Sequence, residues 1–142
     1  MENVQKELTV GTGTWCDTTA DLIGEALQHA TVEDIRKQLD LGAKLFHVTH
    51  YGEIVGAFVL RIDTTATGDE GVIVACTVKL DGVDMFKALL PDIEARFKGC
   101  KSIRYHTARP ALARKLHSLG YAPAEICASK NYDFTPKTLR IR

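Results

Sequence analysis

Apolar residues recur with two different periods along this 142-residue chain. Alternation rich in β-branched residues predicts strands over residues 7–15, 44–63, 101–107 and 125–134. A nearly continuous apolar run predicts a further strand over 71–80, buried on both faces. Spacings of three and four residues predict helices over 17–30, 31–42, 81–99 and within 107–121. Residues 64–70 are polar and are predicted to form a loop.

Start and stop signals sharpen several of these elements. Asp17 or Thr18 can cap the first helix, and Thr31 the second, because their side-chain oxygens accept hydrogen bonds from free amides of the first turn. The dipeptide Tyr51-Gly52 predicts a hairpin turn within 44–63. Pro91 is expected to bend the long helix, since it lacks a backbone donor and crowds the preceding turn.

The order of elements is strand, two helices, three strands, and then helix, strand, helix, strand. The helix at 81–99 joins two strands, which implies a parallel crossover. This order predicts an α/β or α+β fold in a single domain covering residues 1–142. The basic residues 135–142 are predicted to form a C-terminal tail.

Composition excludes few functions, but it bears on the partners and the cellular compartment of the protein. Eighteen basic and eighteen acidic residues balance, so the net charge gives no reason to expect nucleic acid as a partner. The chain has no apolar run long enough for a membrane helix, and its N-terminus lacks the pattern of a signal peptide. The cysteines at 16, 76, 100 and 127 are scattered, which favours reduced thiols in a cytoplasmic protein.

Three segments together resemble the GNAT acyltransferases. They are the hairpin "YGEIVGAFVL", the buried strand "GVIVACTV" leading into a helix, and "ALARKLHSLGY" followed by a strand. The form "RP.LAR.L...GY" also resembles divergent GNAT-like proteins of phages and prophages. The resemblance covers about residues 5–134. It implies a GNAT-like domain whose mixed central sheet is flanked by helices, with the fourth and fifth strands splayed apart.

The resemblance implies acetyl-CoA or another acyl-CoA as cofactor and an amine on a small molecule or protein as acceptor. Pantetheine would pair with the backbone of the fourth strand, and the pyrophosphate would bind amides at the start of the next helix, where unpaired N–H groups carry partial positive charge. The cofactor contacts that follow for this chain are Cys76, Thr77, Val78, Gly82, Val83 and Arg109.

The phosphate-binding loop departs from the family pattern. Where the family has Q/R-x-x-G-x-G/A, this chain has "VKLDGVDMF", which keeps only Gly82 as a glycine. Asp81 and Asp84 place carboxylates there, and these repel a pyrophosphate. Lys79 is either a compensating cation or a solvated lysine. Arg109 is likewise either a phosphate ligand or a surface arginine.

The catalytic residues of the family are also replaced. A tyrosine four residues before the late glycine is the usual acid, and Leu116 stands in that place. The catalytic candidates that remain are Glu70 as a base, and His106 and His117 near the predicted cleft. Structural or solvated roles are the alternative for each. No metal site is predicted, because His47 and His50 lie three residues apart on a strand and face opposite sides.

Two function classes remain open. The first is an acyl-CoA-dependent N-acyltransferase. The second is a GNAT-fold phage or virion protein that has lost catalysis and acts as a binding or structural module, with virion partners. Nucleic-acid modification, known among GNAT-like phage proteins, is a third alternative that the neutral charge does not favour. A homodimer formed through edge strands is compatible with all three.

Overall fold

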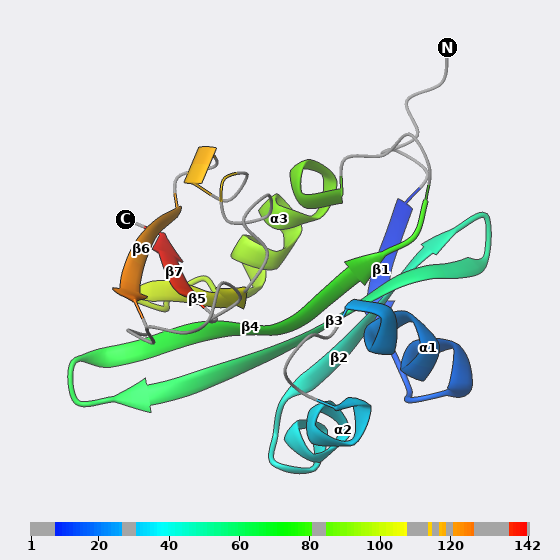
Figure 1. Cartoon of the computed structure of the whole chain (residues 1–142), viewed down its shortest axis with the longest axis horizontal. Coiled ribbons are helices and arrows are strands. Elements are labelled where there is room, and N and C mark those ends of the chain that lie inside the picture. Colours follow the sequence, from blue (N-terminus) through cyan, green and yellow to red (C-terminus); the bar gives the residue numbers. More distant parts are fainter. Residues whose placement is uncertain are drawn as a thin grey trace, which may run out of the picture. The chain divides into compact units, whose positions relative to one another are not determined.

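The computed structural model describes residues 8–26, 31–80, 85–107, 114, 117–118, 121–126 and 137–141. In chain order the elements are β1 (Leu8–Thr12), α1 (Asp17–Ala26), α2 (Val32–Asp40), β2 (Lys44–His50), β3 (Glu53–Thr65), β4 (Gly68–Val78), α3 (Met85–Arg96), β5 (Ser102–Thr107), β6 (Tyr121–Ile126) and β7 (Lys137–Ile141). The strands form one sheet in the order β1-β2-β3-β4-β5-β7-β6 (Figure 1).

The sheet is mixed, which confirms the predicted α/β class. Strand β2 pairs antiparallel with β1 and β3, and β7 pairs antiparallel with β5 and β6. Strands β4 and β5 are parallel, as the intervening helix α3 requires. None of the helices within the described residues has the length and apolar character needed to span a bilayer.

The chain divides into two compact units. The first comprises Met1–Arg61 and Val74–Lys98, and the second comprises Ile62–Ile73 and Gly99–Arg142. Strands β3 and β4 contribute residues to both units.

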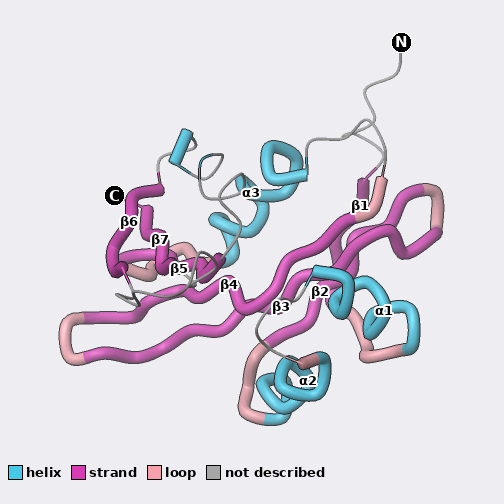
Figure 2. Tube along the Cα trace, viewed as in Figure 1, coloured by secondary structure: helices cyan, strands magenta, loops and turns pink. Residues whose placement is uncertain are grey.

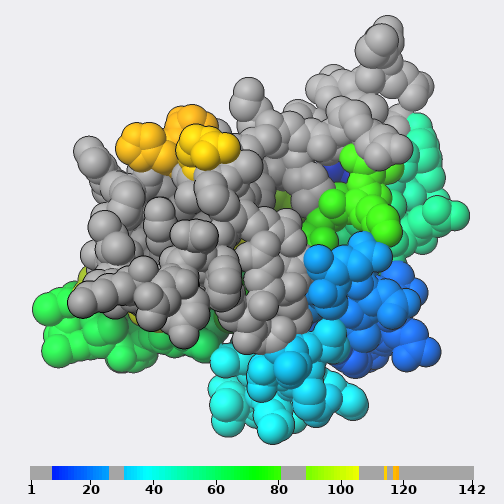
Figure 3. All heavy atoms as spheres, in the orientation of Figure 1, coloured from blue at the N-terminus to red at the C-terminus, as the bar shows by residue number. Residues whose placement is uncertain are grey.

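In the first unit, α1 and α2 cover one face of the strands (Figure 2). The two helices contact each other, and their atoms adjoin in the space-filling view (Figure 3). Alternate residues of the strands point toward these helices, because side chains change face at each step along a strand. The buried residues of this core are Ile23, Ile35, Ala43, Leu45, Ala57, Val59 and Ala75.

Aromatic residues occupy the other face of the same strands. The rings of Phe46 and Phe58 stack with centroids 5.1 Å apart. The guanidinium of Arg96, from α3, lies 4.3 Å from the centroid of the Phe46 ring, an attractive cation–π contact. Strands β2 and β3 are therefore covered on both sides within this unit.

Local signals placed the turns and one cap of the first unit correctly. Thr31 caps α2, and the Thr31 and Asp34 side chains each accept a hydrogen bond from the other residue's backbone N–H. Tyr51 and Gly52 both have positive φ, 49° and 81°, as the predicted hairpin turn requires. The N-cap of α1 was predicted to be Asp17 or Thr18, and this was wrong. The Cys16 carbonyl accepts the first helical hydrogen bond, from the Ala20 N–H, so Cys16 holds the N-cap position and Asp17 is the first helical residue.

Two predictions fail in the second unit. Residues 64–70 are not a loop, because β3 continues to Thr65 and β4 begins at Gly68, whose φ of 133° favours glycine. Residues 137–141 are not a tail but strand β7, which lies between β5 and β6. Alternation over 125–134 predicted one final strand; the structure has β6 at Tyr121–Ile126, and 127–136 lie outside the described residues.

Candidate functional site

The last residues of β4 carry the predicted cofactor contacts Cys76, Thr77 and Val78, and all three are partly buried in the first unit. The parallel ladder between β4 and β5 pairs Glu70 through Ile73 with Ser102 through Tyr105. It ends there, five residues before the end of β4.

A β-bulge in β3 accompanies the end of β4. The register between β2 and β3 shifts so that Val48 is opposite Gly56 and Thr49 is opposite Ile54, leaving Val55 as the extra residue. The Val55 carbonyl accepts a hydrogen bond of 2.7 Å from the Lys79 N–H. The residue that bulges from the β2–β3 ladder therefore bonds the chain directly after the last residue of β4.

Gly56 allows a close approach of two backbones at this point. A Cβ atom on Gly56 would lie 2.6 Å from the Thr77 carbonyl oxygen and 2.9 Å from the Cα of Val78. Both distances are too short for any side chain, so β4 can lie here only beside glycine.

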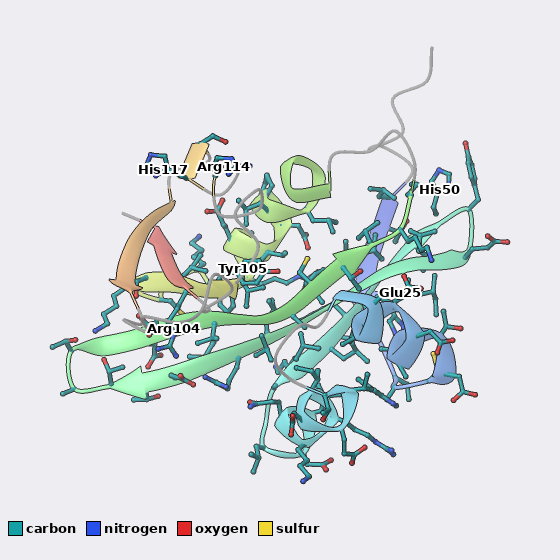
Figure 4. The ribbon with its side chains drawn as sticks, in the orientation of Figure 1. Glu25, His50, Arg104, Tyr105, Arg114 and His117 are labelled. Carbon is teal, nitrogen blue, oxygen red and sulfur yellow. The ribbon has the colours of Figure 1, made fainter. Side chains whose placement is uncertain are left out.

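Cys76 and Lys79 lie in different surroundings at the end of β4. Burial raises the pKa of the Cys76 thiol to about 12, so the thiol is neutral near pH 7 and a poor nucleophile. The Lys79 ammonium donates to both carboxylate oxygens of Glu25, each at 3.1 Å, on an exposed surface (Glu25 is labelled in Figure 4). Lys79 is therefore paired, although exposed pairs of this kind exchange readily with solvent.

Glu70 lies in a polar network of the second unit. Its side chain is buried, and one carboxylate oxygen accepts a 2.9 Å hydrogen bond from the Ser102 hydroxyl. The other oxygen is 3.6 Å from Nε of Arg104, whose Nη2 donates to Asp63 at 3.2 Å (Arg104 is labelled in Figure 4). Strands β3, β4 and β5 each contribute to this network. These contacts give Glu70 a structural role in the second unit, and its catalytic role stays a prediction.

The structure describes some of the other predicted site residues and not the rest. His106 is the fifth residue of β5, opposite Thr138 of β7. His117 is exposed on a helical stretch, as is Arg114 (Figure 4). Gly82, Val83 and Arg109 lie outside the described residues, so their assignments also stay predictions. The described residues hold no group of three or more His, Cys, Asp or Glu able to bind a metal.

Comparison of the sequence with known protein families and with curated proteins gives no match. The structure, in contrast, is similar to solved acetyltransferases over nearly the whole chain. A GNAT family acetyltransferase from Elizabethkingia anophelis with acetyl-CoA bound aligns at a TM-score of 0.70 and 16% identity, covering 95% of this chain and 97% of that one. The chain has the GNAT fold.

Two further structures with this fold carry CoA or a CoA-containing ligand. A Bacillus subtilis acetyltransferase in complex with CoA aligns at a TM-score of 0.70 and 18% identity, covering 94% of this chain and 97% of that one. Arabidopsis thaliana Naa50 in complex with the bisubstrate analogue CoA-Ac-MVNAL aligns at 0.71 and 11% identity, covering 96% and 99%. At these identities the likeness establishes the fold.

Sequence reasoning overlooked two groups of polar residues within the GNAT fold. Asp63 and Arg104 of the buried network are 41 positions apart, and neither belongs to a recognisable motif. A hydrogen-bonded group formed by Cys16, Thr19 and His47 joins α1 to β2 across 28 positions. Only the alternation of β2 gave a hint, since it places His47 on the same face as Leu45.

Proposed function

We propose that this protein binds an acyl-CoA along the end of β4 and transfers the acyl group to an amine of a small molecule or protein. The observation that carries the proposal is the GNAT fold, which matches acetyl-CoA-bound and CoA-bound acetyltransferases over 94–95% of this chain. The end of β4 at the Val55 bulge supports it, because that segment lies beyond the β4–β5 ladder.

The direction in which the backbone N–H and C=O groups of β4 point indicates which two residues can bond the cofactor. The Lys79 N–H points to β3, where it bonds Val55. Because successive residues of a strand direct their backbone groups to opposite edges, those of Thr77 also face β3 and those of Cys76 and Val78 face away. We assign the pantetheine amides to the N–H and C=O groups of Cys76 and Val78.

The acyl group passes directly from CoA to the acceptor in this proposal. The neutral amine attacks the thioester carbonyl, a C–N bond forms, and the C–S bond breaks as the CoA thiolate leaves and takes up a proton. Cys76 does not carry the acyl group, since its thiol stays protonated near pH 7. Glu70, His106 and His117 are the candidates for the proton transfers.

Calorimetric titration with acetyl-CoA tests the binding step. Saturable heat is expected for the wild-type protein, and a Gly56→Val variant should bind at least tenfold more weakly because the new side chain displaces Thr77 and Val78. Gly11→Val is the matched control, since a Cβ on this β1 glycine meets nothing within 4 Å. Circular dichroism verifies that both variants fold. Absence of heat and of any thermal shift with millimolar acetyl-CoA would overturn the proposal.

A second candidate function is binding without catalysis, as in a GNAT-fold module of a phage or virion. The engagement of Glu70 by Ser102 and Arg104 favours it, because this candidate base is occupied. Release of CoA thiol from acetyl-CoA in the presence of polyamines, amino sugars, and peptides with free N-termini or lysines separates the two candidates. Cofactor binding without amine-dependent release supports the module, and release supports the transferase.

A further inference from the structure

Three side chains with complementary proton chemistry meet between α1 and β2. Cys16 precedes α1, Thr19 lies in its first turn, and His47 lies in the middle of β2. The Cys16 Sγ is 3.2 Å from the Thr19 Oγ1, and the same hydroxyl is 2.7 Å from Nε2 of His47. Thr19 is fully buried, so its hydroxyl connects a thiol and an imidazole away from solvent.

The position of the His47 ring is fixed independently of these hydrogen bonds. The ring lies against the backbone of Gly13, where a Cβ would be 2.5 Å from Nδ1. The Gly13 N–H donates to the Leu45 carbonyl at 3.0 Å, which anchors the segment next to β2. Burial lowers the pKa of His47, so the imidazole is neutral near pH 7 and one of its two ring nitrogens is unprotonated. The relay requires the tautomer in which that nitrogen is Nε2, the one 2.7 Å from the Thr19 hydroxyl.

The surroundings of Cys16 favour its thiolate. Its side chain is partly exposed, and hydrogen bonds from the Thr19 side chain and from the Thr19 and Thr18 backbone lower its pKa. They outweigh desolvation and the charge of Asp17, which raise it. Cys100 differs, because burial and the charge of Asp69 raise its pKa. The thiolate is the reactive form of cysteine, so these two partly exposed thiols should differ sharply in reactivity.

We propose that Cys16 is a modification site that undergoes thiol–disulfide exchange with low-molecular-weight disulfides, with Thr19 and His47 as its proton relay. The Cys16 proton moves to Thr19 Oγ1 as the Thr19 proton moves to His47 Nε2. The thiolate attacks one sulfur of the disulfide, a mixed disulfide forms, and the original S–S bond breaks. The released thiolate takes the proton from His47, and the small disulfide is the oxidant. The proposal does not depend on whether the protein binds acyl-CoA.

Reaction with oxidised glutathione, followed by peptide mass spectrometry, tests the proposal in a Cys127→Ser background. Cys16 is expected to form the mixed disulfide at least tenfold faster than Cys100 at pH 7. Thr19→Val, which removes the hydroxyl at nearly constant volume, should slow Cys16 about tenfold and shift its pH–rate profile upward, since the thiolate fraction falls tenfold per unit of thiol pKa.

Three further variants separate the relay from a general effect on folding. His47→Gln should slow Cys16 without altering α1, and Gly13→Ala should do the same by displacing the imidazole ring. Thr19→Ser keeps the hydroxyl and should retain the wild-type rate. The proposal is refuted if Cys16 and Cys100 form the mixed disulfide at equal rates. It is also refuted if Cys16 reacts at the wild-type rate in both Thr19→Val and His47→Gln.

Discussion

At the scale of single residues, Arg104 joins three strands of the second unit. It contacts Asp63 of β3 and Glu70 of β4 from its own position on β5. Glu70 is almost fully buried, and a buried carboxylate is costly unless cations and hydroxyl donors offset its lost hydration. The network therefore offsets the cost of burying Glu70 in the segment where β4 and β5 pair.

Arg104→Met is expected to lower the free energy of unfolding at pH 7 by about 1–3 kcal/mol, the usual cost of leaving a buried polar group without its partner. Methionine keeps most of the side-chain length while removing the charge. Chemical denaturation measures the loss, with the exposed Arg114→Met as a control that should change stability by less than about 0.5 kcal/mol. Equal stability of the two variants would contradict the role given to Arg104.

At the scale of elements, short signals in the sequence set most boundaries. The capping box of Thr31 and Asp34 starts α2, and the positive φ angles of Tyr51 and Gly52 reverse the chain between β2 and β3. Each signal acts within four residues, and the sequence pattern therefore located the start of α2 and the turn between β2 and β3. The extension of β3 and β4 into 64–70 has a longer-range cause, since Lys101 contacts Thr67 through its side chain and bonds Asp69 through its backbone.

Thr31→Ala is expected to destabilise α2 by about 1 kcal/mol, because an unfilled N-cap leaves a first-turn amide without a partner. The Thr31 backbone and side chain also lower the pKa of Asp34. The stability that this carboxylate contributes is fully present above its ordinary pKa and is lost as the pH falls from there through the lowered pKa of the folded protein.

Urea denaturation at pH 7 and at pH 3 checks both parts of this prediction. The wild-type protein should lose more stability between the two pH values than Thr31→Ala does, since the variant has already lost half of the capping box. Thr64→Ala, on the exposed part of β3, is the control and should leave the pH dependence unchanged.

At the scale of the whole molecule, the last strand decides the topology of the second unit. Strand β7 pairs with β5 over Arg104 to Thr107 and with β6 over Tyr121 to Ile126. It is therefore inserted between two strands that precede it in the chain. Polar and apolar residues alternate only from Thr138 to Ile141, and the basic residues Lys137 and Arg140 resemble those of a solvated tail.

Removal of residues 137–142 should unfold the second unit, because β5 and β6 both lose the strand that joins them. Hydrogen exchange measured on peptides covering 102–107 should increase by several orders of magnitude in the truncated protein. Removal of Arg142 alone, which follows β7, should leave the exchange rates unchanged. Unchanged protection of β5 after the longer truncation would mean that β7 is dispensable.

The sequence alone determined the α/β class, the helices α1, α2 and α3, the hairpin turn and the resemblance to GNAT acyltransferases. These follow from periodicity and turn chemistry, which act over a few residues. Its candidate residues were chosen by their position relative to the cleft that the resemblance implies. The resemblance predicts backbone contacts with the cofactor at Cys76–Val78, and the structure adds the Val55 bulge and the close approach at Gly56.

Only the tertiary structure decided the position of β7, the partners of Glu70 and the group formed by Cys16, Thr19 and His47. Each depends on contacts between residues 28 or more positions apart, whose pairing is set by the packing of whole elements. Local patterns carry no information about such pairs. A residue such as Glu70 is therefore a plausible base in the sequence and a buried, engaged carboxylate in the fold, because its chemistry depends on its neighbours in space.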